Sequence, residues 1–300
     1  MQSRYASIHS LPYLPTPTTL DKVADYLAHH RAQNAGAKVA LIVMDGLAMD
    51  QWVILRETLD DLVLREAHIF AWVPTLTAVS RQAIFAGKPP LFFAQSIGTT
   101  QKESQHWTRY WDDQGLRGRA VAYVAERESE DDAVFNARVF EAAEQSQCKV
   151  LGVVVGRVDE MMHGVVTGMG GMHSSVGQWA RRGHFRSLVK GLLSLRFDVF
   201  VTSDHGNIEA TGMGRPNVGA IAETRGDRVF VFSSVHTRSN VHKHFPGSIA
   251  WSTIGLPNEY LPLLPPGTRA FIHEGKRTVG HGGISLEEVI VPFVRIMEAT

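Results

Sequence analysis

The stretch KVALIVMDG, residues 38–46, decides the fold class of this 300-residue chain. The run from Lys38 to Met44 is apolar after its first residue and has the length of a β-strand, and Asp45 and Gly46 end it. Strands that are apolar without alternation are typical of parallel sheets covered on both faces. The run therefore predicts an inner strand of an α/β sheet, with Asp45 at its carboxyl end.

Similar strand-like runs recur along the chain, at residues 68–73, 120–124, 149–155, 197–202, 228–232 and 289–294. One helical pattern precedes the runs, at residues 20–31, and others lie between them, at residues 77–86, 132–146 and 178–195. Strands that alternate with helices predict a doubly wound, mostly parallel sheet flanked by helices. We expect all of these strands to belong to that sheet, and we expect the glycines at 168–171 to form a loop.

The predicted organisation is an N-terminal arm and helix over residues 1–37, followed by one domain over residues 38–300. The first twenty residues contain prolines without any periodic pattern and predict an extended arm. A small insertion is expected at about residues 91–118, where Trp107, Tyr110 and Trp111 lie near helical spacing. Two interpretations stay open: an amphipathic helix that packs these rings on the domain, or a cover over the active site whose rings stack on a base.

Composition excludes several function classes. Thirty Lys and Arg residues balance thirty Asp and Glu residues, so no strong field attracts nucleic acid or an anionic membrane. The single Cys148 excludes an internal disulfide and a cysteine-rich metal site, and it is consistent with a reducing compartment. No apolar run approaches the roughly 20 residues of a membrane span, and no signal peptide is recognisable. We therefore expect a cytoplasmic protein with no membrane partner.

Three acids follow predicted strands closely. Asp45 follows the first run, Asp159 comes shortly after KVLGVVV, and Asp204 follows VFVTS. Ligands of open α/β sheets bind outside the carboxyl ends of the strands, so these carboxylates should converge. Each acid alone is more simply explained as a turn or cap residue.

Histidines accompany these acids. Asp159 and His163 are four residues apart, which places both on one face of a helical turn. His205 directly follows Asp204, and His281 lies in the glycine-rich sequence GHGG, residues 280–283. Mixed aspartate and histidine ligands are typical of zinc or manganese sites. As a set, these residues predict metal binding.

A nucleophile candidate lies in PTLTAVSR, residues 74–81. The residues after Thr77 predict a helix that ends at Gly87, so its hydroxyl lies at a helix N-terminus, where anions bind readily. The alternative is an N-cap threonine without a chemical role. On composition alone, Thr75 and Ser80 compete with Thr77.

Four segments together resemble the alkaline phosphatase superfamily, and their sequences are most similar to its PglZ branch. They are VALIVMDGLAMDQW (39–52), PTLTAVSRQAIFAGKPP (74–90), SDHG (203–206) and GHGGISLEEVIVPF (280–293). The resemblance extends from Lys38 to about Val294. The branch includes components of bacterial phage-defence (BREX) systems and output domains of some response regulators, and its members are commonly longer than this chain.

The resemblance implies two divalent metal ions, zinc first and manganese as the alternative. One ion would be held by Asp45, the Thr77 oxygen, Asp204 and His205, and the other by Asp159, His163 and His281. In the nucleotide pyrophosphatase/phosphodiesterase relatives, the nucleophilic threonine stands three residues after a proline and ten before a glycine. Pro74 and Gly87 have these offsets from Thr77, which selects Thr77. Where those relatives carry a phosphate-binding asparagine this chain has Ser80, followed by Arg81, and these two become the substrate-binding candidates.

The expected function is a metal-dependent phosphodiesterase that cleaves nucleotide-type phosphoesters through a phospho-threonine intermediate. Its expected partners are a phosphoester substrate, in nucleotide or nucleic-acid form, and other phage-defence proteins. The alternatives are a phosphomonoesterase or phosphomutase on the same scaffold, and a weakly catalytic PglZ binding module. A sulfatase is disfavoured because the C/S-x-P-x-R pattern is absent around Thr77.

Overall fold

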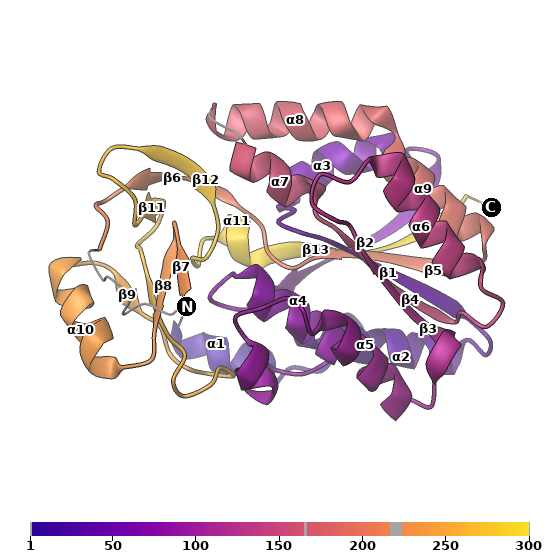
Figure 1. Ribbon diagram of the computed structural model, residues 1–300, viewed down its shortest axis with the longest axis horizontal. Helices are drawn as coiled ribbons and strands as arrows, with labels where there is room; N and C mark the ends of the chain where they lie inside the picture. The colour runs from indigo at the N-terminus through magenta and orange to yellow at the C-terminus, as the bar shows by residue number, and fades with distance from the viewer. Residues whose placement is uncertain (1, 165–166, 217–223, 300) are drawn as a thin grey trace.

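A six-stranded sheet forms the centre of the computed structural model, which describes residues 2–164, 167–216 and 224–299 (Figure 1). The strand order is β2-β13-β5-β1-β4-β3. Strands β5, β1, β4 and β3 are parallel, and β13 is antiparallel to both of its neighbours. The fold prediction of a mostly parallel α/β sheet is confirmed. The bounds are β1 (Lys38–Met44), β2 (Leu62–Phe70), β3 (Val121–Ala125), β4 (Val150–Val155), β5 (Phe197–Ser203) and β13 (Ile290–Glu298).

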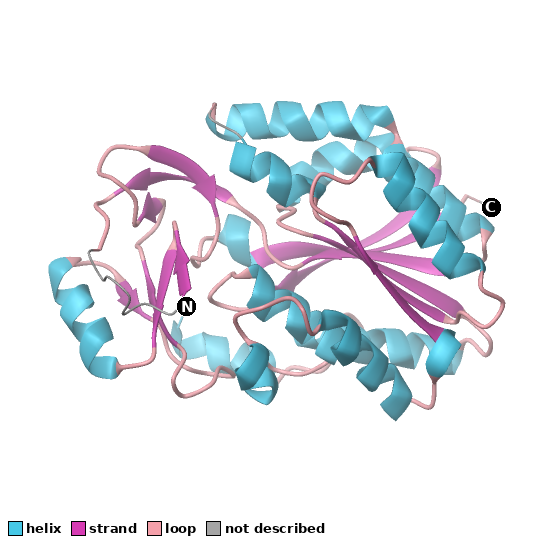
Figure 2. Cartoon of the chain, in the orientation of Figure 1, coloured by secondary structure: helices cyan, strands magenta, loops and turns pink. Residues whose placement is uncertain are grey.

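Helices cover both faces of this sheet, and alternate residues of β1 show why. Val39, Leu41 and Val43 belong to one apolar core, and Ala40, Ile42 and Met44 belong to the other. Figure 2 shows the resulting helix–sheet–helix layers. The first core is closed by α2 (Val23–Gln33), α4 (Thr77–Ala86) and α5 (Glu103–Asp113). The second is closed by α3 (Met49–Arg56), α6 (Asp132–Glu144), α7 (Arg157–Gly164), α8 (Gly168–Arg182) and α9 (His184–Ser194).

A smaller lobe, defined here as residues 208–280 without the undescribed segment, lies beside the carboxyl ends of the parallel strands (Figure 1). It contains a four-stranded sheet of order β7-β8-β10-β9 and a three-stranded sheet of order β11-β6-β12. Phe230, Phe232 and Phe271 are part of its own apolar cluster. The bounds are β6 (Ile208–Gly212), β7 (Thr224–Gly226), β8 (Val229–Phe232), α10 (Val235–His244), β9 (Ile249–Ala250), β10 (Leu261–Leu264), β11 (Arg269–Ala270) and β12 (Arg277–Gly280), after which α11 (Leu286–Val289) leads into β13.

The assignment of residues 228–232 to the main sheet was therefore wrong. This run forms β8, which pairs antiparallel with β7 and β10. A short apolar run specifies a strand, but it contains nothing that specifies which sheet the strand joins.

The extended N-terminal arm was also wrong in part, because residues Gln2–His9 form helix α1. Tyr5 is fully buried, and its hydroxyl accepts a hydrogen bond of 2.9 Å from the Val73 amide. The ring of His9 stacks on Trp72 at 4.1 Å. Tertiary contacts therefore stabilise a helix that local sequence does not indicate. The remaining short helices are 3₁₀ turns at η1 (Leu20–Lys22), η2 (Glu57–Leu59), η3 (Pro90–Ser96) and η4 (Gly118–Ala120).

Two further boundaries differ from expectation. The glycines at 168–171 begin helix α8 instead of forming a loop, because Met172 and Val176 of the same helix are buried against the second core. The helix expected at 178–195 is two helices, separated by Gly183 in the left-handed conformation with φ +79°. None of the helices in the described part of the chain combines the length and apolarity that a membrane span requires.

Helix α5 decides between the two interpretations of residues 91–118. Trp107 and Trp111 are fully buried and Tyr110 is 8% exposed. The Trp107 indole donates to the Ala122 carbonyl at 3.1 Å, beneath the sheet edge strand β3. These rings form part of the first core, so the packing interpretation is confirmed and their proposed role in base stacking is wrong.

Candidate metal centre and active site

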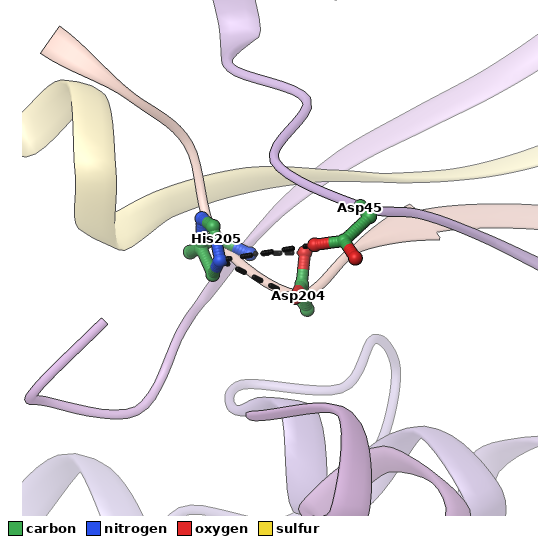
Figure 3. Close-up of side chains that lie close together, drawn as sticks. All are labelled: Asp45, Asp204 and His205. Atoms are coloured by element: carbon green, nitrogen blue, oxygen red, sulfur yellow. Dashed lines mark hydrogen bonds and ion pairs between the residues drawn. The ribbon is translucent and has the colours of Figure 1, made fainter. Parts of the chain in front are cut away.

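The register of the parallel strands brings two distant aspartates together. Met44 of β1 pairs with Ser203 of β5, so the next residues, Asp45 and Asp204, leave the sheet side by side. His205 completes the group, with its Nε2 3.4 Å from Asp204 Oδ2 and 3.9 Å from Asp45 Oδ1 (Figure 3). Among the residues that the structure describes, these three offer ligand atoms within 4.8 Å of one another. They form a possible metal site.

The turn that carries Asp204 and His205 is held by hydrogen bonds from both strands. Ser203 Oγ donates to the His205 carbonyl at 2.6 Å and accepts from the Leu47 amide at 2.9 Å. Asp204 Oδ1 accepts from the amides of Gly46 and His205. A Cβ atom at Gly206 would lie 1.9 Å from the Glu287 carbonyl oxygen, so only glycine fits there. The sequence SDHG is thus a rigid turn that points two ligands at one place.

The negative charges at this centre are only partly compensated, by Arg81 beside Asp45. Burial raises the pKa of Asp204 well above its ordinary value, and the neighbouring Asp45 carboxylate raises it further. Burial also raises the pKa of Asp45, against the opposing influence of the Arg81 guanidinium. Asp45 Oδ1 and Asp204 Oδ2 are buried and have no hydrogen-bond partner. Buried carboxylate oxygens without partners are costly, and a divalent cation would satisfy them.

Two histidine rings lie stacked at this centre with their free nitrogens in the form that binds metals. The rings of His205 and His281 are 3.9 Å apart and nearly parallel. His205 Nδ1 lies 3.0 Å from the Gly206 carbonyl, and His281 Nδ1 lies 2.7 Å from the Thr75 carbonyl. A carbonyl only accepts, so each Nδ1 carries a proton, and Nε2 is the nitrogen of each neutral ring that can bind a metal. Burial, with the adjacent His281 ring, holds the pKa of His205 well below its ordinary value, so His205 is neutral near pH 7.

Thr77 lies at the edge of this group as the first residue of α4. Its hydroxyl is 3.0 Å from His205 Nε2 and donates to that lone pair. Thr75 is fully buried, and its hydroxyl donates to the Gly283 carbonyl and accepts from the Gly282 amide. Ser80 is also fully buried, so in this structure it does not reach an open pocket.

Arg81 connects the centre to helix α5. Its Nη1 donates to Asp45 Oδ2 at 2.8 Å and its Nη2 donates to Glu103 Oε2 at 2.6 Å. Burial opposes the charged guanidinium, yet the two carboxylates raise the pKa of Arg81 above its ordinary value. Sequence reasoning missed Glu103, which is 1% exposed, because nothing in the sequence indicates that it pairs with Arg81 across 22 residues.

Asp159 and His163 lie on α7, next to this group. His163 Nε2 is 3.4 Å from Asp159 Oδ2, which confirms that the spacing of four places both on one helical face. Asp159 also packs against Gly46, since a Cβ there would lie 3.6 Å from Asp159. Burial alone would raise the pKa of Asp159, but the hydrogen bond with His163 and the nearby histidines hold it below its ordinary value. The same hydrogen bond raises the pKa of His163.

The loop that carries His281 is anchored by a buried ion pair. Arg228 of the smaller lobe and Glu288 of α11 are both fully buried, and Arg228 Nε donates to Glu288 Oε1 at 2.8 Å. Arg228 Nη2 donates to Glu288 Oε2, Ser285 Oγ and the Gly267 carbonyl, and Nη1 donates to the Arg269 carbonyl. Glu288 also accepts from the amides of Gly283 and Ser285, at 2.8 and 3.0 Å. This pair ties the smaller lobe to the loop of residues 281–285.

A pocket of about 490 Å³ opens beside the metal centre. Asp45, Arg81, Asp159 and His163 are among the residues that line it. Its remaining lining residues come from strand β4 and from the segments that follow β3 and β4, and they are Glu126, Glu128, Ser129, Val154, Gly156 and Glu160.

The sequence matches a known family over most of its length. Residues 25–296 match the family described as the BREX system PglZ alkaline phosphatase-like domain. The chain belongs to the PglZ family. Its resemblance to that family is thereby confirmed over nearly the whole sequence. A search of curated proteins found no match to this PglZ chain.

Three of the solved structures with a similar fold are forms of enzymes that act on phosphorus compounds. Murine ectonucleotide pyrophosphatase/phosphodiesterase 5 superposes with a TM-score of 0.61 at 13% identity, covering 86% of this PglZ chain and 87% of that chain. An inactive form of the same murine enzyme in complex with AMP has a TM-score of 0.57 at 14% identity, over 86% and 87% of the two chains. Phosphonoacetate hydrolase from Sinorhizobium meliloti 1021 in complex with phosphonoformate has a TM-score of 0.53 at 13% identity, over 86% and 89%. At these identities the likeness establishes the alkaline phosphatase-like fold of the PglZ chain.

Proposed function

We propose that this PglZ chain is a metal-dependent phosphodiesterase that uses Thr77 as its nucleophile. One observation carries the proposal: the Thr77 hydroxyl lies 3.0 Å from His205 Nε2, beside two buried aspartates with unpaired oxygens. A threonine hydroxyl attacks phosphorus only when it is activated, and a cation held by such ligands activates it.

The proposal includes two divalent metal ions, with zinc first and manganese second. Asp45, Asp204, His205 and the Thr77 oxygen would hold one ion, and Asp159, His163 and His281 would hold the other. The unpaired oxygens of Asp45, Asp159 and Asp204, together with the free Nε2 atoms of the two stacked histidines, support this assignment. Such ions, when bound, lower the pKa of coordinated hydroxyl groups and stabilise charge on the attacking and leaving oxygens.

The residues of the chain have the following roles in the proposed reaction. In the metal-free protein His205 Nε2 accepts a hydrogen bond from the Thr77 hydroxyl and keeps it beside the aspartates; a bound ion would take that lone pair and hold the Thr77 oxygen in the same place. The hydroxyl loses its proton to solvent when Oγ1 attacks phosphorus. A new Oγ1–P bond forms as the bond from phosphorus to the leaving oxygen breaks, and that oxygen takes a proton from water. Water then cleaves the phospho-threonine, which releases a monoester and restores the hydroxyl. Arg81 holds Asp45 in position throughout.

Diesters are the preferred substrate class in this proposal. The Pro74, Thr77 and Gly87 spacing resembles the diesterase relatives. Arg81 already contacts two carboxylates, which neutralise its charge, so it would do little to stabilise the second negative charge of a monoester. The AMP complex of a protein with the same fold supports a nucleotide-type diester, and the BREX description of the family supports a cytoplasmic phage-defence role alongside other defence proteins.

Hydrolysis of bis(p-nitrophenyl) phosphate and of p-nitrophenyl phosphate, each with zinc, with manganese and without metal, tests the proposal. We expect kcat/KM for the diester to be at least about tenfold higher, and Thr77→Ala to lower it by about 10³ or more while Thr77→Ser retains part of it. Because Thr77 makes a single side-chain hydrogen bond, the free energy of unfolding of the Ala variant should differ from that of wild type by no more than about 1 kcal/mol. A folded Thr77→Ala protein with near wild-type turnover would move the nucleophile elsewhere, and metal-loaded wild type without turnover would favour the binding-module alternative.

A further inference from the structure

The pocket beside the metal centre is acidic. Glu126, Glu128 and Glu160 line it together with Asp45 and Asp159, and its basic lining residues are Arg81 and His163. Asp45 is 7% exposed and has an unpaired Oδ1. The pocket therefore joins the proposed metal ligands to a wall of carboxylates, defined here as Glu126, Glu128 and Glu160.

One guanidinium is shared among the acids of this wall. Arg157 donates to Glu126 at 2.7 Å, to Glu160 at 2.8 Å and to Asp132 at 3.2 Å. Glu126 is further fixed by the Gly156 amide at 2.7 Å. Glu128 is exposed, and no hydrogen bond or ion pair to it appears among the described residues. Bound metal ions would neutralise Asp45 and Asp159, but the wall would keep its excess negative charge.

The segment that carries Glu128 is held in a specific conformation. The next residue, Ser129, has φ +56°, a left-handed conformation that non-glycine residues seldom adopt. The Ser129 amide donates to Glu160 Oε1 at 3.1 Å, which ties this segment to α7. Backbone strain of this kind persists where the surrounding structure holds it, often at ligand sites. Here it keeps Glu128 on the pocket wall.

In the proposed reaction the leaving group would occupy this pocket. Thr77 is not among its lining residues, whereas Asp159 and His163 are. In-line attack by Thr77 places the leaving oxygen on the side of phosphorus opposite Thr77. The group attached to that oxygen would extend into this pocket, towards Glu128.

We infer that the leaving group of the substrate is an alcohol that carries positive charge, such as an ammonium-bearing alcohol, and carries no further phosphate. This inference rests on the proposed function. The wall attracts a cation by Coulomb interaction and repels an additional phosphate. A nucleotide-type diester satisfies it when its second ester group is cationic, whereas a polynucleotide does not.

Three phenyl phosphodiesters test the inference, because they differ only in the second alcohol: choline, 3,3-dimethylbutanol as its neutral isostere, and 2-hydroxyethyl phosphate. Release of each alcohol by the metal-loaded protein is followed by mass spectrometry. We expect kcat/KM for alcohol release to be about tenfold higher with choline than with dimethylbutanol, and lowest with the phosphate-bearing ester, from the additive effect of partly exposed charges.

Variants at Glu128 sharpen the test. Glu128→Gln should reduce the preference for choline about two- to fivefold, and Glu128→Lys should reduce it further and improve the phosphate-bearing ester. Glu144→Gln is the matched control, since Glu144 is an exposed glutamate of α6 outside the pocket, and it should change nothing. Equal release of all three alcohols by active wild type, or a Glu128→Lys preference equal to that of wild type, overturns the inference and leaves the proposed function standing. If the metal-loaded wild type cleaves none of a broad set of phosphodiesters, the proposed function itself is overturned.

Discussion

Replacing Arg228 by alanine should destabilise the protein and loosen the loop that carries His281. The change leaves the Glu288 carboxylate fully buried without its cation, together with the carbonyls of Gly267 and Arg269 that Arg228 now satisfies. Removing one partner of a buried ion pair costs about 3–5 kcal/mol. For 300 residues, the unfolding entropy is about 0.6 kcal/mol per kelvin, so the midpoint Tm should fall by about 5–8 °C.

Calorimetry of metal-free protein and zinc titration of folded protein measure the two effects. Because Glu288 positions the amides of Gly283 and Ser285, the loosened loop should weaken zinc binding about tenfold at the site that includes His281. Arg228→Lys should lie between wild type and Arg228→Ala, since lysine keeps the charge but loses the paired geometry.

Arg277→Ala is the matched control for this prediction. Arg277 also belongs to the smaller lobe and pairs with Glu209 at 3.1 Å, but its side chain is 75% exposed. Exposed pairs contribute about 0–1 kcal/mol, so its Tm should change by less than about 2 °C. Equal Tm values for wild type and Arg228→Ala would refute the assignment of Arg228 as the anchor of the loop.

Three more predictions follow from the centre and its surroundings. Asp159→Ala and Asp204→Ala should each remove about one metal ion per chain, and elemental analysis that finds at most one ion in zinc-saturated wild type contradicts two separate sites. Since burial raises the pKa of Asp204, native metal-free protein binds more protons than unfolded protein above pH 3.8, and its stability falls as pH rises through the window up to that raised pKa. Asp204→Asn should therefore raise the free energy of unfolding of metal-free protein by about 0.5–2 kcal/mol at pH 7, and it should abolish zinc binding. A lower free energy of unfolding than wild type in urea would contradict this prediction. Trp107→Ala should lower the free energy of unfolding by about 3–5 kcal/mol, because its ring is part of the core, and it should cause no selective loss of oligonucleotide cleavage. A selective loss in folded protein would indicate that Trp107 contacts the substrate.

The sequence predicts the main sheet well because its parallel strands are buried on both faces. KVALIVM indicates an inner strand by composition alone, and the aspartates that follow β1 and β5 are brought together by strand register. The nucleophile helix is equally local, since Gly87 ends α4 in the left-handed conformation.

What the sequence does not predict depends on tertiary partners. Helix α1 exists because Tyr5 and His9 pack on residues about 65 positions away, and β8 joins a second sheet that its four apolar residues do not specify. Glu103 and the acidic pocket wall are ordinary surface-like acids in sequence. Their roles appear only when Arg81 and Arg157 are seen beside them.

Strand β13 has a consequence for how the protein is made. It follows every other strand of the described residues in sequence, yet it lies between β2 and β5 inside the main sheet. Until residues 290–298 leave the ribosome, β2 has no partner on that side and the edge of β5 is open to solvent. Such open edges are where incomplete chains aggregate or recruit chaperones. The loop with His281 and the Arg228–Glu288 pair immediately precede β13, so a nascent chain acquires its full set of proposed ligands only when translation of this domain is nearly finished. A truncated translation product would therefore be catalytically silent as well as unstable.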